Sequence, residues 1–331
     1  MRFSIRRRGI LILAALLALG AAGRWGLSTG PRGAEVDRLE WGLYQILWSR
    51  EYGRHISAEI DKFASKPHYL MFYRDLDRRF PKKPIDAIAN SGATTIVSLE
   101  LWRWHDRRGE SYLPRICAGE FDDRLRQWAR DARADGRRVL LRFGFEFNGD
   151  WFSWSGDPAQ YIAAWRRAHD IFQKEGAANV EWVWAPNFVS VPDKPENDMH
   201  LYYPGDAYVD WVGVDGYNFG DHHDEWHKWE SFEVLFGSLL ADFARRYPNK
   251  PLMLAEFGCA VGEAKARQQW IRQAYAYLRK KCPRVRAVIW FNYDKRREGE
   301  PNWRIDATEG ALEAFNETFA APTRSPATNA G

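Results

Sequence analysis

Short apolar segments alternate along this chain with longer segments in which apolar residues recur at the 3.6-residue spacing of a helix. The short segments are rich in β-branched and aromatic residues, which favour strands. They predict eight strands, at 41–45, 69–73, 95–99, 138–143, 180–185, 211–215, 252–256 and 287–291. Strands that alternate with helices in this way build βα units and a parallel sheet.

The longer segments contain helix boundaries that can be read from the sequence. Asp157 can cap a helix whose first position is Pro158, and Gly176 follows the expected end of that helix. Further helices are predicted around 232–243 and 270–278, where large apolar residues repeat on one face. Each of these helices lies between two predicted strands, as a βα repeat requires.

Eight strands with intervening helices close naturally as a single-domain (β/α)8 barrel, or TIM barrel, which we expect over residues 36–319. No linker rich in Pro or Ser interrupts this stretch. An open, doubly wound sheet is the alternative fold, but no glycine-rich phosphate loop follows the first predicted strand. The last segment, 320–331, has the composition of a disordered tail.

Residues 1–23 have the composition of a secretory signal peptide. Four arginines, at positions 2, 6, 7 and 8, precede an uncharged run rich in Leu, Ile and Ala. We therefore expect export to a periplasmic or extracellular location. The run is short for a membrane span, which needs about 20 apolar residues, but an uncleaved signal anchor stays open as an alternative.

The charge balance argues against a nucleic-acid partner. The chain has 48 basic and 44 acidic residues, and removing residues 1–23 takes away four basic and no acidic residues, which leaves 44 of each. Proteins that bind nucleic acids normally carry a basic excess on one face. The three cysteines, Cys117, Cys259 and Cys282, permit at most one disulfide, so a packed core must stabilise the fold.

The segment LLRFGFEFNGDWFSW at 140–154 places one carboxylate, Glu146, at the end of an apolar run and two tryptophans, Trp151 and Trp154, just beyond it. Sugars offer hydroxyls to hydrogen bonds and C–H faces to indole rings, and an acetal oxygen leaves readily only when an acid protonates it. The segment therefore indicates glycoside chemistry. Either tryptophan could instead pin the loop to the barrel.

Alternation along the predicted strands places several polar side chains at one mouth of the barrel. Arg142 and Glu146 share a face of the fourth strand, and Glu256 shares a face with the leucines two and four residues before it. Tyr217 from the sixth strand and Trp290 from the eighth would reach the same rim. Active sites of such barrels lie at the C-terminal ends of the strands, so two carboxylates are predicted to meet there.

Several ordered motifs extend this picture over most of residues 36–319. They are RFGFEFNGDWFSW at 142–154, WVWAPN at 182–187, YVDWVGVDGYNFG at 208–220, KPLMLAEFG at 250–258, and IWFNYDK with NWRID at 289–306. With these motifs the sequence resembles glycoside hydrolase family 26. The resemblance implies a barrel of the clan whose acid/base and nucleophile follow the fourth and seventh strands.

The resemblance also implies roles for individual residues. Glu146 would be the general acid/base and Glu256 the nucleophile. Tyr217 would hydrogen-bond the nucleophile, and Trp290 would be the platform under the sugar at the cleavage point. Further substrate contacts are expected from Arg142, Asn148, Trp151, Trp154 and Asn187. Arg142 could also keep the nearby nucleophile ionised.

These residue types suit a retaining endo-β-glycosidase that acts by double displacement. Glu256 would attack the anomeric carbon while Glu146 protonates the leaving oxygen, and Glu146 would then activate water to release the covalent intermediate. This mechanism requires carboxyl groups about 5–5.5 Å apart and uses neither a metal nor a cofactor. We expect a monomer whose partner is a polysaccharide or an oligosaccharide.

Phe145 departs from the family pattern, in which histidine usually precedes the acid/base. A histidine there could hydrogen-bond the sugar near its 2-hydroxyl, where mannose and glucose differ, and phenylalanine cannot. Family members typically cut β-mannans, and others act on mixed-linkage β-glucan or β-1,3-xylan, so the substrate stays open, a bacterial exopolysaccharide included. Two alternatives also remain: a non-catalytic carbohydrate-binding barrel, and a membrane-anchored hydrolase acting in exopolysaccharide synthesis or release.

A cluster of metal-binding residue types follows the sixth predicted strand. It consists of Asp221, His222, His223, Asp224 and His227, of which two histidines four residues apart would share one face of a helix. Hydrolysis by two carboxylates needs no metal, so substrate contacts or solvated polarity are the simpler interpretation of this loop.

Overall fold

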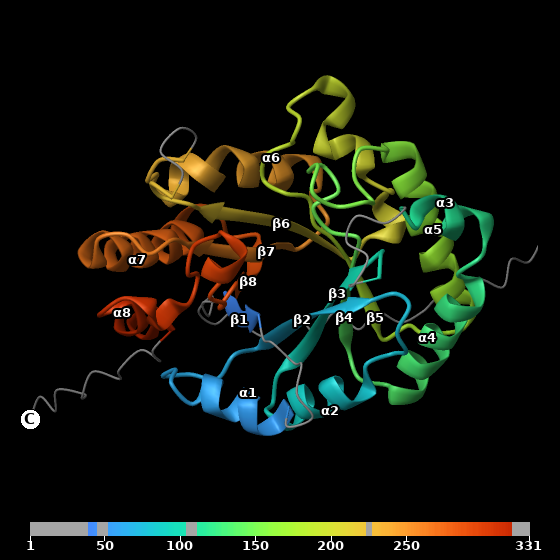
Figure 1. The fold of residues 1–331 in the computed structure, drawn as a ribbon, viewed down its shortest axis with the longest axis horizontal. Coiled ribbons are helices and arrows are strands. Elements are labelled where there is room, and N and C mark those ends of the chain that lie inside the picture. Colours follow the sequence, from blue (N-terminus) through green and yellow to red (C-terminus); the bar gives the residue numbers. More distant parts are fainter. Residues whose placement is uncertain (1–38, 45–51, 104–110, 223–226, 320–331) are drawn as a thin grey trace, which may run out of the picture. The chain divides into compact units, whose positions relative to one another are not determined.

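Eight parallel strands form a closed barrel (Figure 1). The computed structural model describes residues 39–44, 52–103, 111–222 and 227–319. In chain order the strands are β1 (Glu40–Tyr44), β2 (Tyr69–Asp75), β3 (Thr94–Glu100), β4 (Val139–Phe143), β5 (Val180–Trp184), β6 (Trp211–Asn218), β7 (Leu252–Cys259) and β8 (Val285–Trp290). Each strand pairs with the next one along the chain, and β1 closes the barrel against β8. The predicted TIM barrel is therefore confirmed.

All eight predicted strands are present, and the largest differences from the prediction lie at the ends of β6 and β7. These two strands continue to Asn218 and Cys259, three residues beyond the predicted ends in each case. They stay paired with each other over this extension, as far as the pair that Asn218 and Cys259 themselves form. The extension contains polar residues and glycine, so an apolar pattern alone could not identify it as strand.

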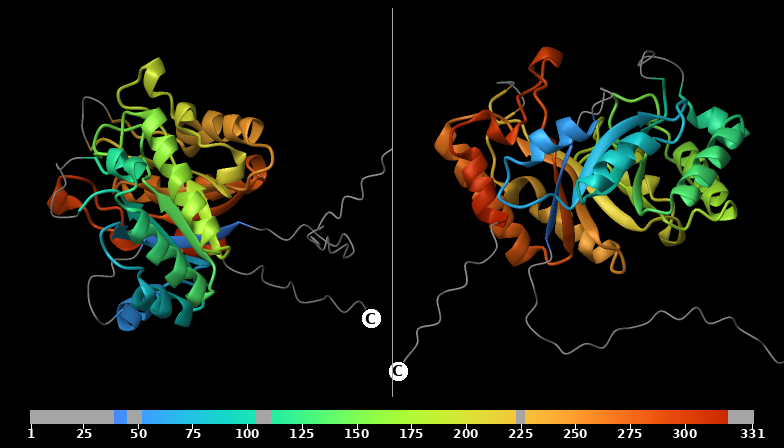
Figure 2. Two further views of the ribbon diagram at one scale, coloured as in Figure 1. Left: turned by 90° about the vertical axis from the view of Figure 1, so that its right-hand side faces the viewer. Right: turned by 90° about the horizontal axis from the view of Figure 1, so that it is seen from below.

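Helices cover the outside of the strands (Figures 1 and 2). They are α1 (Tyr52–Ile60), α2 (Lys82–Asn90), α3 (Leu113–Ala118), α4 (Asp122–Asp135), α5 (Pro158–Lys174), α6 (Ser238–Arg246), α7 (Ala264–Lys281) and α8 (Ala311–Phe319). Short 3-10 turns lie in the loops after β5 and β8, at Pro195–Asn197, Met199–Tyr202, Asp206–Tyr208, Arg296–Glu298 and Ile305–Ala307. Figure 2 shows α4 and α5 side by side, where Arg130 and Glu175 form an ion pair of 2.8 Å.

Two helix starts illustrate how far the sequence predicts local structure. The Asp157 side chain accepts a hydrogen bond of 2.9 Å from the backbone N–H of Gln160, so α5 begins with the expected cap. The helix expected at 232–243 begins instead with a π-helical turn, Glu233–Gly237, which continues into α6. An apolar repeat at helical spacing does not distinguish a wider π turn from an α turn.

Large aromatic side chains fill the space between the strands and the helices. The ring of Trp165 in α5 lies 5.4 Å from that of Trp182 in β5. Trp270 in α7 and Trp290 in β8 meet in the same layer at 6.5 Å. Arg142 of β4 points the other way, into the centre of the barrel. The barrel wall is thus apolar toward the helices and polar near its mouth.

Within the four ranges that the structure describes, no helix combines the length and the apolar character needed to cross a membrane. The segment predicted as a signal peptide or anchor, 1–23, and the predicted tail, 320–331, both lie outside those ranges. Both therefore stay predictions.

Candidate active site

Three carboxylates meet at the C-terminal mouth of the barrel, and we call them the carboxylate cluster: Glu146 after β4, Asp215 in β6 and Glu256 in β7. Oxygen atoms of these three groups all lie within 4.8 Å of one another. Retaining glycosidases hold their two carboxyl groups about 5–5.5 Å apart and inverting ones about 6.5–9.5 Å, so this proximity favours the retaining type. The structure therefore brings together the two glutamates that the sequence analysis singled out.

A β-bulge turns Glu256 toward the mouth. β6 and β7 pair Val214 with Leu254 and then Asp215 with Glu256, so Ala255 is an extra residue in β7. Paired residues of neighbouring strands point to the same side of a sheet, and the extra residue reverses the direction of the side chains that follow it. Glu256 thus faces the barrel interior together with Asp215. The expectation that it shares a face with the preceding leucines was wrong.

Three donors surround the carboxylate of Glu256. Arg142 Nη1 lies 2.5 Å and the Tyr73 hydroxyl 2.6 Å from Oε1. The Tyr217 hydroxyl donates to Oε2 at 2.8 Å. Burial and the negative charge of Glu256 raise the pKa of both tyrosines, so both hydroxyls stay protonated and donate. Charge-assisted hydrogen bonds of this kind fix the orientation of the carboxylate.

Arg142 is completely buried and joins two members of the carboxylate cluster. Its Nη2 donates to Asp215, while its Nη1 contacts Glu256 and the Ser98 hydroxyl, the latter at 2.8 Å. Burial raises the pKa of Asp215, and the Arg142 cation acts in the opposite direction. A buried cation needs such partners. With no exposed surface, Arg142 holds the Glu256 carboxylate in place, and the predicted contact between Arg142 and substrate was wrong.

Glu146 occupies a different environment. Burial and the negative charge of Glu256 raise the pKa of Glu146 to about 7, while a 2.7 Å hydrogen bond from Trp151 Nε1 acts in the opposite direction. The backbone of Glu146 has a φ of 51°, which is uncommon for a residue other than glycine, and its N–H donates to the carbonyl of Ala185 at 2.9 Å. A carboxyl group that titrates near neutral pH can both give and accept a proton.

Asn148 and Asn187, which were both predicted to contact the substrate, join two loops. The side chain of Asn148 accepts a hydrogen bond from the backbone N–H of Asn187 at 2.8 Å and donates to its carbonyl at 2.9 Å. The side-chain amide of Asn187 donates to the carbonyl of Val189 at 2.8 Å. Asn148 has no exposed surface, so its predicted contact with substrate was wrong, and Asn187 is only 6% exposed. Together they fasten the loop that carries Glu146 to the loop after β5.

The two tryptophans after Glu146 differ in exposure. Trp151 is 41% exposed, so its ring is available to a sugar while its N–H contacts Glu146. Trp154 has no exposed surface, stacks on Phe152 with ring centroids 4.3 Å apart, and donates its N–H to the carbonyl of Phe145 at 2.8 Å. The sugar contact predicted for Trp154 was therefore wrong. Trp154 pins the loop to the barrel, which is the alternative that the sequence left open.

Trp290 is also completely buried and is no platform for a sugar in this structure. Its ring faces Phe315 of α8 at 6.3 Å, and its N–H donates to the carbonyl of Trp303 at 2.7 Å. The prediction was wrong because it placed Trp290 on the inward face of β8. Side chains alternate between the two faces of a strand, so an error of one residue exchanges the inward and outward residues. The next residue, Phe291, lies at the mouth and stacks on Tyr44 with ring centroids 4.7 Å apart.

Three aromatic residues at the site were not singled out from the sequence: Tyr44, Tyr73 and Phe291. The ring of Tyr73 lies 5.1 Å from that of Tyr44 and 5.3 Å from that of Phe145. Phe291 lies 5.9 Å from the ring of Tyr217. A usable signal did exist, because each of the three occupies one of the last two positions of a predicted strand.

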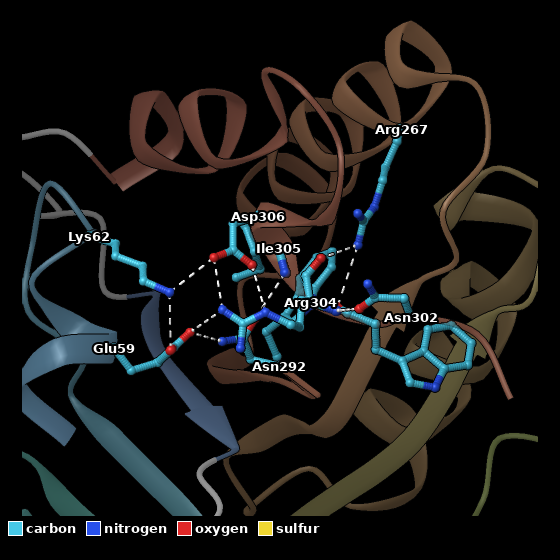
Figure 3. A network of polar contacts seen from close by, with 10 residues as sticks. Glu59, Lys62, Arg267, Asn292, Asn302, Arg304, Ile305 and Asp306 are labelled. Carbon is cyan, nitrogen blue, oxygen red and sulfur yellow. Dashed lines mark hydrogen bonds and ion pairs between the residues drawn. The ribbon is translucent and has the colours of Figure 1, made fainter. Parts of the chain in front are cut away.

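A polar network holds the segment after β8 in place (Figure 3). Arg304 pairs with Glu59 of α1 at 2.9 Å. The buried guanidinium of Arg267 in α7 donates to the carbonyl of Arg304 at 2.7 Å. The residue before Arg304, Trp303, packs against Tyr217 with ring centroids 4.7 Å apart. The network therefore fixes an indole ring that supports one of the three donors to Glu256.

The structure describes only part of the histidine cluster considered as a metal site. Residues 223–226 lie outside the described ranges, and His222 Nε2 lies 3.0 Å from the carbonyl oxygen of Gly299 in the loop after β8. Within the described ranges, the carboxylate cluster is the one group with the spacing of metal ligands. Arg142 already places a positive charge beside two of its members. The metal alternative in the loop after β6 stays a prediction.

A closed eight-stranded barrel with paired carboxylates after β4 and in β7 is the architecture of a large class of glycoside hydrolases. The family model described as glycosyl hydrolase family 26 matches residues 111–279. The chain belongs to this family.

Named relatives agree with this assignment, and a solved structure shares the fold. Endoglucanase H of Acetivibrio thermocellus is 34% identical over 249 residues, which cover 73% of this chain and 26% of that protein. Mannan endo-1,4-beta-mannosidase A and B of Caldalkalibacillus mannanilyticus is 25% identical, over 70% of this chain and 44% of that protein. This chain thus spans less than half the length of either relative. The catalytic domain of a family 26 endo-beta-1,4-mannanase from Bacillus sp. JAMB-750 shares the fold, with a TM-score of 0.63, 16% identity and 86% of both chains covered.

Proposed function

We propose that this protein is a retaining endo-β-glycosidase that cleaves a β-linked polysaccharide of the glucan or mannan type. The observation that carries the proposal is the pairing of Glu146 with Glu256, which bring one carboxylate oxygen each to within 4.8 Å of the other. Their environments differ as the two roles require. Three donors bind Glu256, whereas burial and the charge of Glu256 raise the pKa of Glu146 to about 7.

The reaction would proceed in two displacements. First, Glu256 forms a bond to the anomeric carbon while the bond to the leaving oxygen breaks, and Glu146 gives its proton to that oxygen. Second, a water molecule gives a proton to Glu146 and attacks the anomeric carbon, and the bond to Glu256 breaks. Each displacement inverts the anomeric carbon, so the product retains the configuration of the substrate.

The environment of Phe145 indicates which sugar to test first. Its ring is 3% exposed and lies over the guanidinium of Arg142 at 4.7 Å, so it offers no polar group to a 2-hydroxyl. The relative named an endoglucanase is 34% identical to this chain and the one named a mannosidase 25%. Mixed-linkage β-glucan is therefore the first substrate to test, before mannan, β-1,3-xylan and bacterial exopolysaccharides.

We further propose that the protein is exported and acts as a monomer. The four arginines and the apolar run within residues 1–23 support export. Mass spectrometry of the mature N-terminus would separate a cleaved signal from an anchor. Sedimentation of the purified protein would test whether it is a monomer.

The function itself is tested by assaying the wild type and the variant Glu256→Ala on these polysaccharides, with the configuration of the products followed by NMR. We expect the wild type to release β-configured oligosaccharides and the variant to bind oligosaccharides without cleaving them. A variant of the exposed Glu120, Glu120→Ala, is the control and should keep activity. Near-normal hydrolysis by Glu256→Ala would refute the assignment, and wild-type binding without cleavage would indicate the non-catalytic binding barrel.

A further inference from the structure

The two oxygens of the Glu256 carboxylate have different surroundings. Oε1 accepts hydrogen bonds from Arg142 Nη1 at 2.5 Å and from the Tyr73 hydroxyl at 2.6 Å. Among the described residues, the one donor to Oε2 is the Tyr217 hydroxyl, at 2.8 Å. A carboxylate oxygen has two lone-pair positions. Both positions on Oε1 are thus occupied, and Oε2 keeps one for a bond to carbon.

We propose that Oε2 is the attacking oxygen of Glu256 and that Tyr73 is a catalytic residue that accelerates the second displacement through Oε1. The proposal rests on the retaining hydrolysis proposed above and deepens it. Tyr73 belongs to none of the motifs that carry the family resemblance. Its contact with the reacting carboxylate gives it this role.

The reason lies in how the charge on Glu256 changes during the reaction. In the first displacement the carboxylate becomes an ester and loses its negative charge, so the hydrogen bond from Tyr73 to Oε1 becomes weaker. In the second displacement the ester bond breaks, the electron pair returns to the carboxylate, and the same hydrogen bond becomes stronger. Only interactions that strengthen on the way to a transition state accelerate the step. Tyr73 should therefore favour release of the intermediate and give no help to its formation.

The packing around Tyr73 suits this role. Its ring lies between Tyr44, at 5.1 Å, and Phe145, at 5.3 Å, so the hydroxyl has a fixed position. Phe145 also lies over the guanidinium of Arg142 at 4.7 Å and is itself only 3% exposed. One apolar ring therefore covers both donors to Oε1 and shields them from water, which strengthens their hydrogen bonds to a charged group. This gives the residue that departs from the family pattern a physical function.

The variant Tyr73→Phe removes the hydroxyl and keeps the ring. The test uses 2,4-dinitrophenyl β-cellobioside or the matching mannobioside, whichever the wild type hydrolyses. This leaving group departs without a proton, so kcat reports the second displacement and kcat/KM the first. We expect kcat to fall about three- to tenfold, since a hydrogen bond to a full charge contributes a factor of about 10–100 and the transition state carries part of that charge. We expect kcat/KM to stay the same or to rise, because the lost hydrogen bond weakens during the first displacement, so KM falls at least as far as kcat. Mass spectrometry of quenched reactions should show more glycosyl-enzyme than in the wild type.

The matched control is Tyr161→Phe. Tyr161 is a buried residue of α5 whose hydroxyl donates to the carbonyl of Phe143 at 3.0 Å in the barrel wall. This variant loses the same group from a structural position, so it should leave the ratio of kcat to kcat/KM unchanged. An equal fall in kcat and kcat/KM for Tyr73→Phe, or no change in kcat, would overturn the proposal. A wild type that cleaves neither glycosides nor polysaccharides would instead overturn the proposed function.

Discussion

The indole N–H of Trp151 lies 2.7 Å from Glu146 Oε2, while 41% of the Trp151 side chain remains exposed. The same side chain thus contacts the proposed acid/base and presents a ring to the solvent side of the site. A sugar that stacks on this ring would lie beside the carboxyl group that we propose protonates its leaving oxygen. Trp151 therefore links the position of the substrate to the protonation of Glu146.

The hydrogen bond from Trp151 predicts a shift in the pH dependence of activity. Burial and the charge of Glu256 raise the pKa of Glu146 to about 7, and Trp151 stabilises the ionised form and so lowers this pKa. Removing the N–H in Trp151→Phe should raise the pKa of Glu146 further. Because the first displacement needs protonated Glu146, the basic limb of kcat/KM should move to higher pH. The measurement is kcat/KM between about pH 5 and 9, a range that includes the raised pKa of Glu146. A basic limb that stays in place or moves to lower pH would contradict this account.

The raised pKa of Glu146 also predicts a stability effect. In the unfolded chain this carboxyl ionises near 4.5, whereas in the folded protein its pKa is about 7. Ionisation therefore opposes folding, and stability falls as the pH rises from 4.5 to 7 and stays reduced above it. Glu146→Gln should raise the free energy of unfolding at pH 8 by on the order of 1–3 kcal/mol, since one pKa unit corresponds to about 1.4 kcal/mol.

Urea unfolding at pH 4.5 and pH 8 would measure this effect, because 4.5 is the ordinary pKa of the group. The stabilisation should be small at the lower pH and full at the higher one. Glu120→Gln, at an exposed position, serves as the control and should show no such difference between the two pH values. Equal stabilisation by Glu146→Gln at both pH values would mean that packing, and not ionisation, is responsible.

The sequence predicted the barrel well because the fold depends on repeated apolar segments, and a shift of one residue within a segment does not change the number of strands. The same shift changes which side chains reach the site. Ala255 inserts a bulge into β7 that reverses the direction of Glu256, and no feature of KPLMLAEFG marks it. In β8 the aromatic pair Trp290 and Phe291 offers two equally plausible inward residues. In both strands the pairing register with the neighbouring strands determines which side chains point inward. That register cannot be read from the sequence.

Residue type likewise says little about exposure at a loop. Asn148, Trp151 and Trp154 lie within seven residues, and sugar contact was a reasonable expectation for all three. Only Trp151 keeps exposed surface, because the side chains of Asn148 and Trp154 are buried in hydrogen bonds that hold the loop. Tyr73 went unnoticed because its partner, Glu256, lies 183 positions away and on another strand. A contact of this range follows only from the closed barrel.

The opposite environments of Trp290 and Phe291 can be separated by substitution. Trp290→Phe removes buried ring volume and the 2.7 Å hydrogen bond to the carbonyl of Trp303. It should lower the free energy of unfolding by about 1–3 kcal/mol. Because the ring faces α7 and α8, KM for the polysaccharide should stay within about twofold of the wild type, a change worth less than about 0.5 kcal/mol.

Phe291→Leu should have the opposite profile. This ring stacks on Tyr44 at the mouth, 5.9 Å from the ring of Tyr217, so its loss removes a flat surface beside the reacting carboxylate. We expect KM to rise several-fold, with a smaller loss of stability than in Trp290→Phe because a leucine refills most of the volume. Urea unfolding and steady-state kinetics on both variants give the comparison. If Trp290→Phe instead had normal stability and a raised KM, Trp290 would be the sugar platform after all. Its side chain would then lie on the inward face of β8, as the alternation of residues along this strand first suggested.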